Sequence, residues 1–233
     1  KNLSVKVGEK QILNQISFDF EIGKNYCILG KNGSGKSSLA MTLAGNPKYE
    51  ISEGELLLDG QNLTEMTPDE RNKAGIFLTF QNIPEIPGVK LFEFLKTIYD
   101  ARAEKPSTFL EFKKIIEPLM AELEIEKAFL WRDLNVGFSG GEKRKIEVLQ
   151  IKLLKPKYII LDEIDSGLDV NAVRQVAELL KAVNTEENSF IVITHLFEML
   201  QELPLEKILI LEQGQIKAIG GRELMEQVRK EGF

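Results

Sequence analysis

The sequence predicts an α/β fold with a small antiparallel β subdomain near its start and a helical segment in its middle. Short apolar runs suited to buried strands alternate with helical patterns, as in a parallel sheet covered by helices. The residues up to Ile22 instead follow a two-residue rhythm, which is typical of half-buried strands. From Leu91 to about Pro156 the apolar residues recur at spacings of three and four, which predicts helices.

The composition is that of an ordinary soluble globular protein, with 43% hydrophobic and 28% charged residues. No apolar stretch approaches the roughly 20 residues that span a bilayer, so we expect no membrane insertion. A secretory signal is not visible, and the single Cys27 cannot form an internal disulfide, so we expect a cytoplasmic protein. The net charge of −6 argues against a nucleic-acid surface, and the basic run Lys143–Lys145 is interpreted as a helix face.

The first elements are predicted to be strands. Apolar and polar residues alternate from Leu3 to Val7, and the same rhythm continues from Ile12 to Ile22. Glu55–Asp59, followed by Gly60, gives another strand, and the three together predict a small antiparallel sheet. Next come a buried strand at Tyr26–Leu29 and a helix from Ser37 that ends at Gly45.

The later elements alternate between the two types. A short helix begins at Thr67-Pro68 and ends at Gly75, and the loop Asn82–Val89 is predicted to be non-helical because it holds two prolines. The remaining predicted elements are a strand at Ile76–Phe80, a helix at Ser139–Leu154 with Ser139 and Glu142 as a capping box, strands at Tyr158–Leu161 and Phe190–Ile193, a helix at Val173–Val183, and a hairpin of Ile208–Leu211 and Ile216–Ile219 around Gln213-Gly214.

Gly30–Ser37, with the sequence GKNGSGKS, fits the template Gly, four variable residues, Gly-Lys-Ser/Thr, between a strand and a helix. Its glycines let the backbone curl, so that N–H groups and the helix start face a phosphate chain. Lys36 would reach the outer phosphates and Ser37 would bind Mg²⁺. The alternative is a glycine-rich turn with no ligand. The predicted phosphate contacts are Gly30, Lys31, Asn32, Gly33, Ser34, Gly35, Lys36, Ser37 and Ser38.

Two carboxylates follow the apolar strand that ends at Leu161. Asp162 can hold Mg²⁺, and Glu163 can polarise the attacking water as a general base. The alternative is a pair of solvated loop acids. Because the same chain carries a phosphate loop, we favour the catalytic interpretation.

Two other polar residues end strands, the position from which α/β sheets present their chemistry. His195 is the only histidine, and its side chain could contact the terminal phosphate. A structural or merely exposed histidine is the alternative. The amide oxygen of Gln81 could bind Mg²⁺ or the attacking water.

A second helix start can bind anions. Ser139 opens it, and Gly140 and Gly141 allow close backbone approach, while Glu142 completes the cap. A cap with no ligand is the alternative. Because the chain already has one phosphate loop, this second site predicts contact with a partner subunit's nucleotide.

Together these motifs resemble those of the ATP-binding-cassette (ABC) ATPases over essentially the whole chain, with Ser166-Gly167-Leu168-Asp169 as a further match. The resemblance implies a P-loop NTPase cassette with a RecA-like core, ATP and Mg²⁺ as cofactors, and two subunits facing head to tail. Each ATP would lie between one subunit's phosphate loop and the other's Ser139, with Asp169 in the loop that communicates across the interface.

The resemblance also implies a single ABC domain over residues 1–233. Within it, residues 1–81 and 156–233 would form the nucleotide-binding core with the antiparallel subdomain, and 82–155 the helical subdomain with the signature motif.

Within that family the sequence is similar to SufC, the soluble ATPase of the SUF iron-sulfur cluster assembly system. The similarity lies in Glu85–Val89 after the glutamine, Asn135–Lys143 around the signature, and Asp162–Asp169. It departs where many cassettes stack an aromatic ring on adenine, since Val7 and Gly8 stand there, and this predicts modest base affinity.

The SufC resemblance implies scaffold partners of the SufB and SufD type, remodelled by ATP-driven dimerisation. We expect them to contact the loop after Gln81 and the next helix, which carries Phe92 and Phe94, although core packing is the alternative for these rings. The alternative function is the nucleotide-binding subunit of an ABC membrane importer, which would share the catalytic residues. A DNA-associated or nucleotide-gated cassette is opposed by Glu163, His195 and the lack of a coiled-coil insertion.

Overall fold

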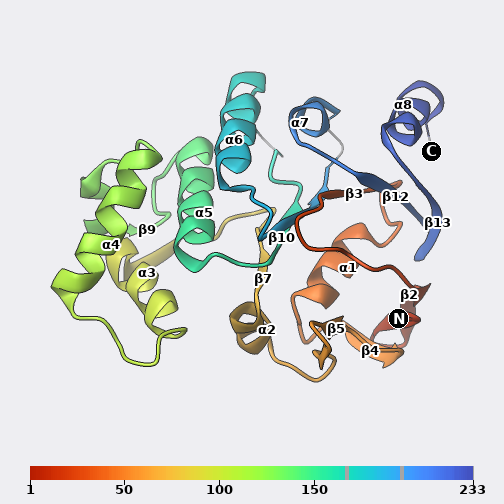
Figure 1. Ribbon diagram of the computed structural model, residues 1–233, viewed down its shortest axis with the longest axis horizontal. Coiled ribbons are helices and arrows are strands. Elements are labelled where there is room, and N and C mark those ends of the chain that lie inside the picture. The colour runs from red at the N-terminus through yellow and green to blue at the C-terminus, as the bar shows by residue number, and fades with distance from the viewer. Residues whose placement is uncertain (166–167, 195–196, 233) are drawn as a thin grey trace. The chain divides into compact units, whose positions relative to one another are not determined.

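The computed structural model describes residues 1–165, 168–194 and 197–232, which group into two units (Figure 1). The first unit contains Lys1–Phe80, Pro156–Asp165 and Asn184–Phe233, and the second contains Gln81–Lys155 and Ser166–Val183. The first unit holds the two larger sheets, and the second is mainly helical.

The larger sheet has six strands in the order β13-β12-β3-β11-β10-β7. Neighbouring strands run parallel, except for the antiparallel hairpin of β12 and β13. All residues of β3 and β11 are buried, which is why these strands are so apolar. The predicted parallel core is confirmed by β3 (Tyr26–Leu29), β7 (Ile76–Leu78), β10 (Tyr158–Asp162), β11 (Ser189–Ile193) and β12 (Lys207–Glu212), and the predicted hairpin by β12 and β13 (Gln215–Gly220).

The smaller sheet is antiparallel in the order β2-β1-β4, which confirms the predicted β subdomain. β1 (Leu3–Val7) matches its predicted bounds, and β2 spans Lys10–Ile16. The prediction of a third strand at Glu55–Asp59 was wrong, because β4 (Glu50–Glu53) pairs with β1 instead. Only β5 (Leu57–Leu58) forms within that stretch, and it pairs with β6 (Gln61–Asn62). Because β4 is an edge strand with a glutamate at each end, it lacks the apolar pattern by which strands are predicted from sequence.

The two-residue rhythm after Ile16 does not continue the strand. Phe18 and Phe20 instead pack edge to face on Tyr26, with ring centroids 5.4 and 5.0 Å from its ring. These apolar residues therefore serve aromatic packing and not sheet pairing.

Helix α1 (Lys36–Leu43) follows β3 and packs against β2, β7 and β10. Leu39 and Leu43 join Ile28, Ile160 and Ile191 of the larger sheet in the buried core of this unit. As predicted, α1 ends before Gly45, and α2 (Pro68–Ala74) follows Thr67 and ends at Gly75, which is left-handed. The structure adds a capping box at the start of α2. The sequence patterns did not predict α7 (Phe197–Glu202) or α8 (Arg222–Glu231).

The second unit contains the predicted helices. Its elements are β8 (Ile86–Lys90), α3 (Leu91–Asp100), α4 (Phe109–Glu122), the 3₁₀ helix η1 (Lys127–Trp131), β9 (Asp133–Leu134), α5 (Gly140–Leu154) and α6 (Val170–Val183). The stretch Asn82–Val89 is non-helical as predicted, although β8 pairs part of it with β9. The predicted capping box at the start of α5 is confirmed.

An aromatic cluster occupies one part of the second unit. Phe92 is buried, and its ring lies 4.8 Å from that of Phe109 and 5.3 Å from that of Trp131. Its expected role as an exposed partner contact was therefore wrong, and the core-packing alternative holds for it. The exposed rings of this cluster are Phe109 and Trp131, and Leu110, which follows Phe109 in sequence, is also exposed. These three residues are called the aromatic patch.

Candidate functional site

The phosphate loop joins the buried strand β3 to the start of α1. Gly33 and Gly35 have φ values of 79° and 107°, in the left-handed region that favours glycine, and Gly35 is the N-cap of α1. The N–H of Ser34 donates to the carbonyl of Lys31 at 3.1 Å, which closes the turn. The loop therefore delivers its backbone directly to a helix N-terminus, where unpaired N–H groups and the helix dipole favour an anion.

Lys36 spans this loop from the first turn of α1. Its Nζ donates to the carbonyls of Gly30 at 2.8 Å and Lys31 at 3.2 Å, and the residue is 5% exposed. Burial lowers the pKa of Lys36, while Glu163 and Asp162 oppose that shift by electrostatic attraction. The ammonium group is thus held at the loop, near Asp162, the last residue of β10, and Glu163, which follows it.

The hydroxyl of Ser37 donates to Oδ1 of Asp162 at 3.2 Å. Burial raises the pKa of Asp162, the Ser37 hydroxyl and Lys36 lower it, and Glu163 raises it. A hydroxyl and a carboxylate oxygen this close are hard donors of the kind that Mg²⁺ prefers. Since Mg²⁺ is usually held by one or two carboxylates together with phosphate oxygens and waters, these residues fit its requirements.

Glu163 follows the last residue of β10 in a left-handed conformation, with φ of 48°, and its N–H donates to the carbonyl of Ile193 at 2.8 Å. A non-glycine residue in this region carries backbone strain, which is concentrated at functional sites. The bond to β11 holds the turn that brings Glu163 to the end of the parallel strands.

Thr79 supports this end of β10 and was not found from the sequence. Its hydroxyl donates to the carbonyl of Ile160 and accepts from the N–H of Asp162, both at 3.2 Å. Thr79 therefore fixes the backbone at Asp162. A single threonine near the end of a strand gives no sequence signal for such a contact.

The other predicted residues lie in the second unit, except for His195, which lies outside the described residues together with Ser166 and Gly167. Ser139 is the N-cap of α5. Its Oγ accepts from the N–H of Glu142 at 3.3 Å, and its own N–H donates to Glu142 Oε2 at 2.7 Å. The bond from the Ser139 backbone holds the pKa of Glu142 below its ordinary value.

Gly140 and Gly141 differ in how closely other residues approach them at this helix start. A side chain at Gly140 would meet Leu168 at 3.3 Å, whereas none of the described atoms lies within 4 Å of the corresponding position at Gly141. Asp169 is exposed and its Oδ1 accepts from the N–H of Ala172 at 2.9 Å, at the start of α6. The start of α5 is therefore open at Gly141. This geometry suits a helix start that binds a ligand and equally a helix cap with no ligand.

Gln81 is tied to α5 by a hydrogen bond from Arg144, which also forms a buried ion pair within the helix. Arg144 Nη1 lies 2.6 Å from Glu147 Oε2, with about 5% of each side chain exposed, and Arg144 Nη2 donates to the carbonyl of Gln81 at 3.2 Å. The basic run Lys143–Lys145 lies on a helix as predicted, although Arg144 is buried within it. The sequence signal was an Arg–Glu pair one turn apart among apolar residues.

Arg144→Met is expected to lower the free energy of unfolding by about 3–5 kcal/mol, because it removes the guanidinium that faces a buried carboxylate. The double variant Arg144→Met/Glu147→Leu is expected to recover most of that loss, since two apolar side chains replace both charges. Urea denaturation of the two proteins and the wild type measures this. A loss in the double variant equal to or greater than that in Arg144→Met would contradict it.

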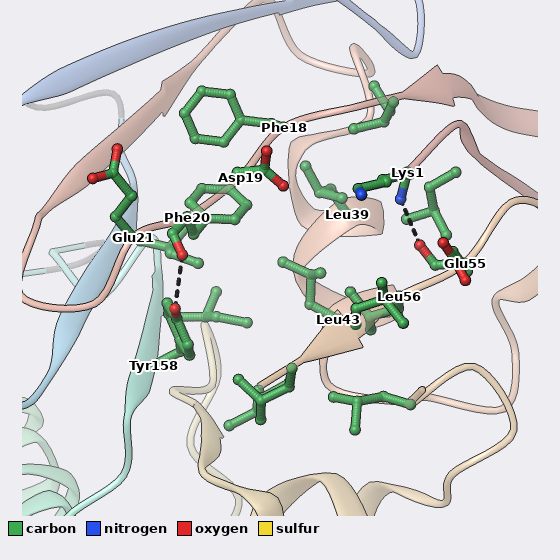
Figure 2. Close-up of a pocket in the computed structure, with 18 of the residues that line it drawn as sticks. Lys1, Phe18, Asp19, Phe20, Glu21, Leu39, Leu43, Glu55, Leu56 and Tyr158 are labelled. Carbon is green, nitrogen blue, oxygen red and sulfur yellow. Dashed lines mark hydrogen bonds between the residues drawn. The ribbon is translucent and has the colours of Figure 1, made fainter. Parts of the chain in front are cut away.

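A cavity of about 420 Å³ in the first unit has a different character (Figure 2). Leu39 and Leu43 of α1 line it together with Phe20, and the hydroxyl of Tyr158 donates to the carbonyl of Phe20 at 2.7 Å. No residue of the phosphate loop lines it, and the acids beside it, among them Asp19, would repel a triphosphate. The loop therefore offers an anion more favourable surroundings than this cavity does.

A buried strand, a glycine-rich loop and a helix that carries Lys36 and Ser37 beside Asp162 define a P-loop nucleotide-binding protein. The family described as ABC transporter matches residues 13–166. The ATP-binding cassette MJ0796, in a dimeric post-hydrolysis state bound to ADP and Pi, aligns with a TM-score of 0.80 and 23% identity over 95% of this chain and 97% of that one. This likeness confirms the ABC cassette fold.

Two relatives match the whole chain more closely. The probable ATP-dependent transporter ycf16 of Antithamnion sp. is 41% identical in an alignment of 237 positions, which covers 100% of this chain and 94% of that protein. The probable ATP-dependent transporter SufC of Escherichia coli K12 is 38% identical, over 100% of this chain and 96% of that one. The chain belongs to the SufC/ycf16 family of ABC ATPases. Among its described helices, none is both long and apolar enough to cross a bilayer.

Proposed function

We propose that this chain binds ATP with Mg²⁺ and hydrolyses it to ADP and phosphate. The observation that carries the proposal is the convergence of Lys36, Ser37 and Asp162, with the Ser37 hydroxyl 3.2 Å from the carboxylate. Lys36 binds the outer phosphates, and Ser37 and Asp162 would hold Mg²⁺. The ion, when bound, neutralises charge on the phosphates.

Glu163 is the proposed general base. Its carboxylate, placed beyond the strand end by the left-handed turn, takes a proton from the attacking water. Gln81 and His195 are proposed to contact the water or Mg²⁺ and the terminal phosphate, respectively, as the family resemblance implies. In this proposal Asp162 binds the ion and Glu163 takes the proton.

ATP is proposed to join two copies of the chain head to tail. The start of α5, with Ser139 as its cap and an open surface at Gly141, would bind the nucleotide of the other subunit, and Asp169 would lie at the same interface. Dimeric structures of the cassette MJ0796, which shares this fold, support the arrangement.

The dimer is proposed to serve the SUF iron-sulfur cluster assembly system by remodelling scaffold proteins of the SufB and SufD type. The whole-length similarity to SufC of Escherichia coli supports this role. The proposed contact surface is the loop after Gln81, with Ile86 38% exposed, and the aromatic patch, where Trp131 is 49% exposed on buried Phe92. Exposed rings grouped in this way mark interaction sites.

The importer alternative shares every catalytic residue and differs in the partner. The test is binding of the purified chain, with and without MgATP, to purified SufB and SufD scaffolds and to an ABC permease in detergent. We expect binding to the scaffolds. Binding to the permease alone would overturn the SUF role while leaving the ATPase role intact.

Trp131→Ala is expected to weaken scaffold binding at least about tenfold, since buried aromatic anchors dominate interface energies. The matched control is Ile219→Ala, which removes an apolar side chain that is 51% exposed on β13 in the first unit. Titration of the scaffold followed by fluorescence anisotropy gives both affinities. Equal affinities for Trp131→Ala and wild type would exclude the aromatic patch from the interface.

A further inference from the structure

The turn between β12 and β13 lies directly against the phosphate loop. The N–H of Gly214 donates to the carbonyl of Ser34 at 2.9 Å, and the carbonyl of Gly214 accepts from the N–H of Asn14 at 2.9 Å. One glycine thus uses both of its backbone groups, one on the loop and one on β2. The phosphate loop is thereby joined, through this turn, to β2.

The approach is too close for side chains. A Cβ at Gly214 would lie 2.2 Å from the carbonyl oxygen of Ile12, and a Cβ at Gly30 would lie 2.2 Å from that of Leu211. A Cβ at Gly35 would lie 2.8 Å from the side chain of Leu13. Backbone therefore meets backbone where Gly30 of the loop lies against Leu211 and where Gly214 of the turn lies against Ile12, and these two contacts depend on glycine.

The bond to Ser34 sets the direction of a loop amide. The carbonyl of Ser34 and the N–H of Gly35 belong to one trans peptide plane, in which they point in opposite directions. When Gly214 holds the carbonyl on one side, the N–H of Gly35 is directed to the other. Gly35 is the N-cap of α1, so this amide lies where helix starts bind phosphate.

We propose that Gly214 is a positioning residue for the nucleotide site: its backbone holds the phosphate loop in the shape that binds ATP. The inference rests on the proposed function of that loop. It extends the nucleotide-binding machinery to a hairpin turn outside the sequence motif. Its role is to fix amide direction before ATP arrives, so that less ordering is needed on binding.

Gly214→Ala tests the proposal against the matched variant Gly60→Ala. Both glycines have positive φ, 76° and 80°, so both substitutions strain the backbone, but at Gly60 no described atom lies within 4 Å of a Cβ. Only Gly214→Ala should push the turn away from β2 and the loop. Calorimetric titration with MgATP is expected to give at least a tenfold higher Kd for Gly214→Ala and less than a twofold change for Gly60→Ala.

Steady-state kinetics separate positioning from general damage. For Gly214→Ala, the KM for ATP is expected to rise at least tenfold while kcat stays within threefold of wild type, because Glu163 is untouched. Equal Kd values for Gly214→Ala and wild type, or an equal loss in both glycine variants, would overturn the inference. Failure of the wild type to bind MgATP would instead overturn the proposed function of the loop.

A measurement on the wild type keeps the inference testable if Gly214→Ala does not fold. Amide hydrogen exchange at Gly214 is expected to slow at least tenfold when MgATP binds, since a stabilised Ser34 carbonyl holds this N–H more firmly. Exchange at Gly60 is expected to stay unchanged. An unchanged exchange rate at Gly214 in the presence of bound MgATP would show that the hydrogen bond from the turn to Ser34 does not respond to nucleotide binding, and would overturn the inference.

Discussion

Glu163→Gln is expected to lower ATP turnover by about a hundredfold to ten-thousandfold while ATP binding persists, because an amide cannot take a proton from the attacking water. Glutamine has the same size, and the groups proposed to hold the nucleotide, Lys36, Ser37 and Asp162, remain in place. Since the nucleotide is bound but not consumed, the ATP-bound dimer should accumulate. Phosphate release, calorimetry and gel filtration with MgATP measure these three effects.

The matched control is Glu178→Gln, which makes the same change at an exposed position on α6 and should leave turnover within twofold of wild type. Hydrolysis by Glu163→Gln at the wild-type rate would refute the general-base role. Loss of ATP binding in this variant would show that the carboxylate supports the loop and not the chemistry.

The parallel core could be predicted because its strands are buried on both faces. Such strands must be apolar throughout, so Tyr26–Leu29 and Phe190–Ile193 stand out from their surroundings. Edge strand β4 shows the opposite case, because two of its four residues are exposed, none is buried, and its ends are charged. Phe92 also misled the sequence analysis, since an aromatic residue on a helix has no mark that tells core from surface until its neighbours are known.

The proximity of Ser37 and Asp162 could be predicted because motif and topology coincide. The two residues are 125 positions apart in sequence, yet Ser37 lies beyond the end of β3 and Asp162 is the last residue of β10, and the carboxyl ends of these parallel strands share an edge of one sheet. The supporting contacts are different in kind. Gly214 holds Ser34 through backbone atoms, and Arg144 reaches the carbonyl of Gln81, so neither contact depends on a side-chain pattern visible in the sequence around the motif.

Lys36→Ala is expected to raise the Kd for MgATP about a hundredfold, or about 2.7 kcal/mol, because a charged hydrogen-bond donor to the phosphates is removed. The structure adds a second cause, since Nζ also holds the carbonyls of Gly30 and Lys31, and a loop released from this contact must be ordered again when ATP binds. Calorimetric titration measures the affinity.

Two variants separate the causes in Lys36→Ala. Lys10→Ala removes one positive charge from an exposed position on β2 and should change the Kd less than twofold, which controls for net charge. Lys36→Arg keeps the charge but replaces a compact ammonium with a planar group that does not match the space between two carbonyls of one loop. We expect its affinity to lie between those of Lys36→Ala and wild type. Undiminished affinity in Lys36→Ala would contradict the proposed role of Lys36 in binding the phosphates, because the backbone amides of the loop would then suffice to bind the nucleotide without the ammonium group.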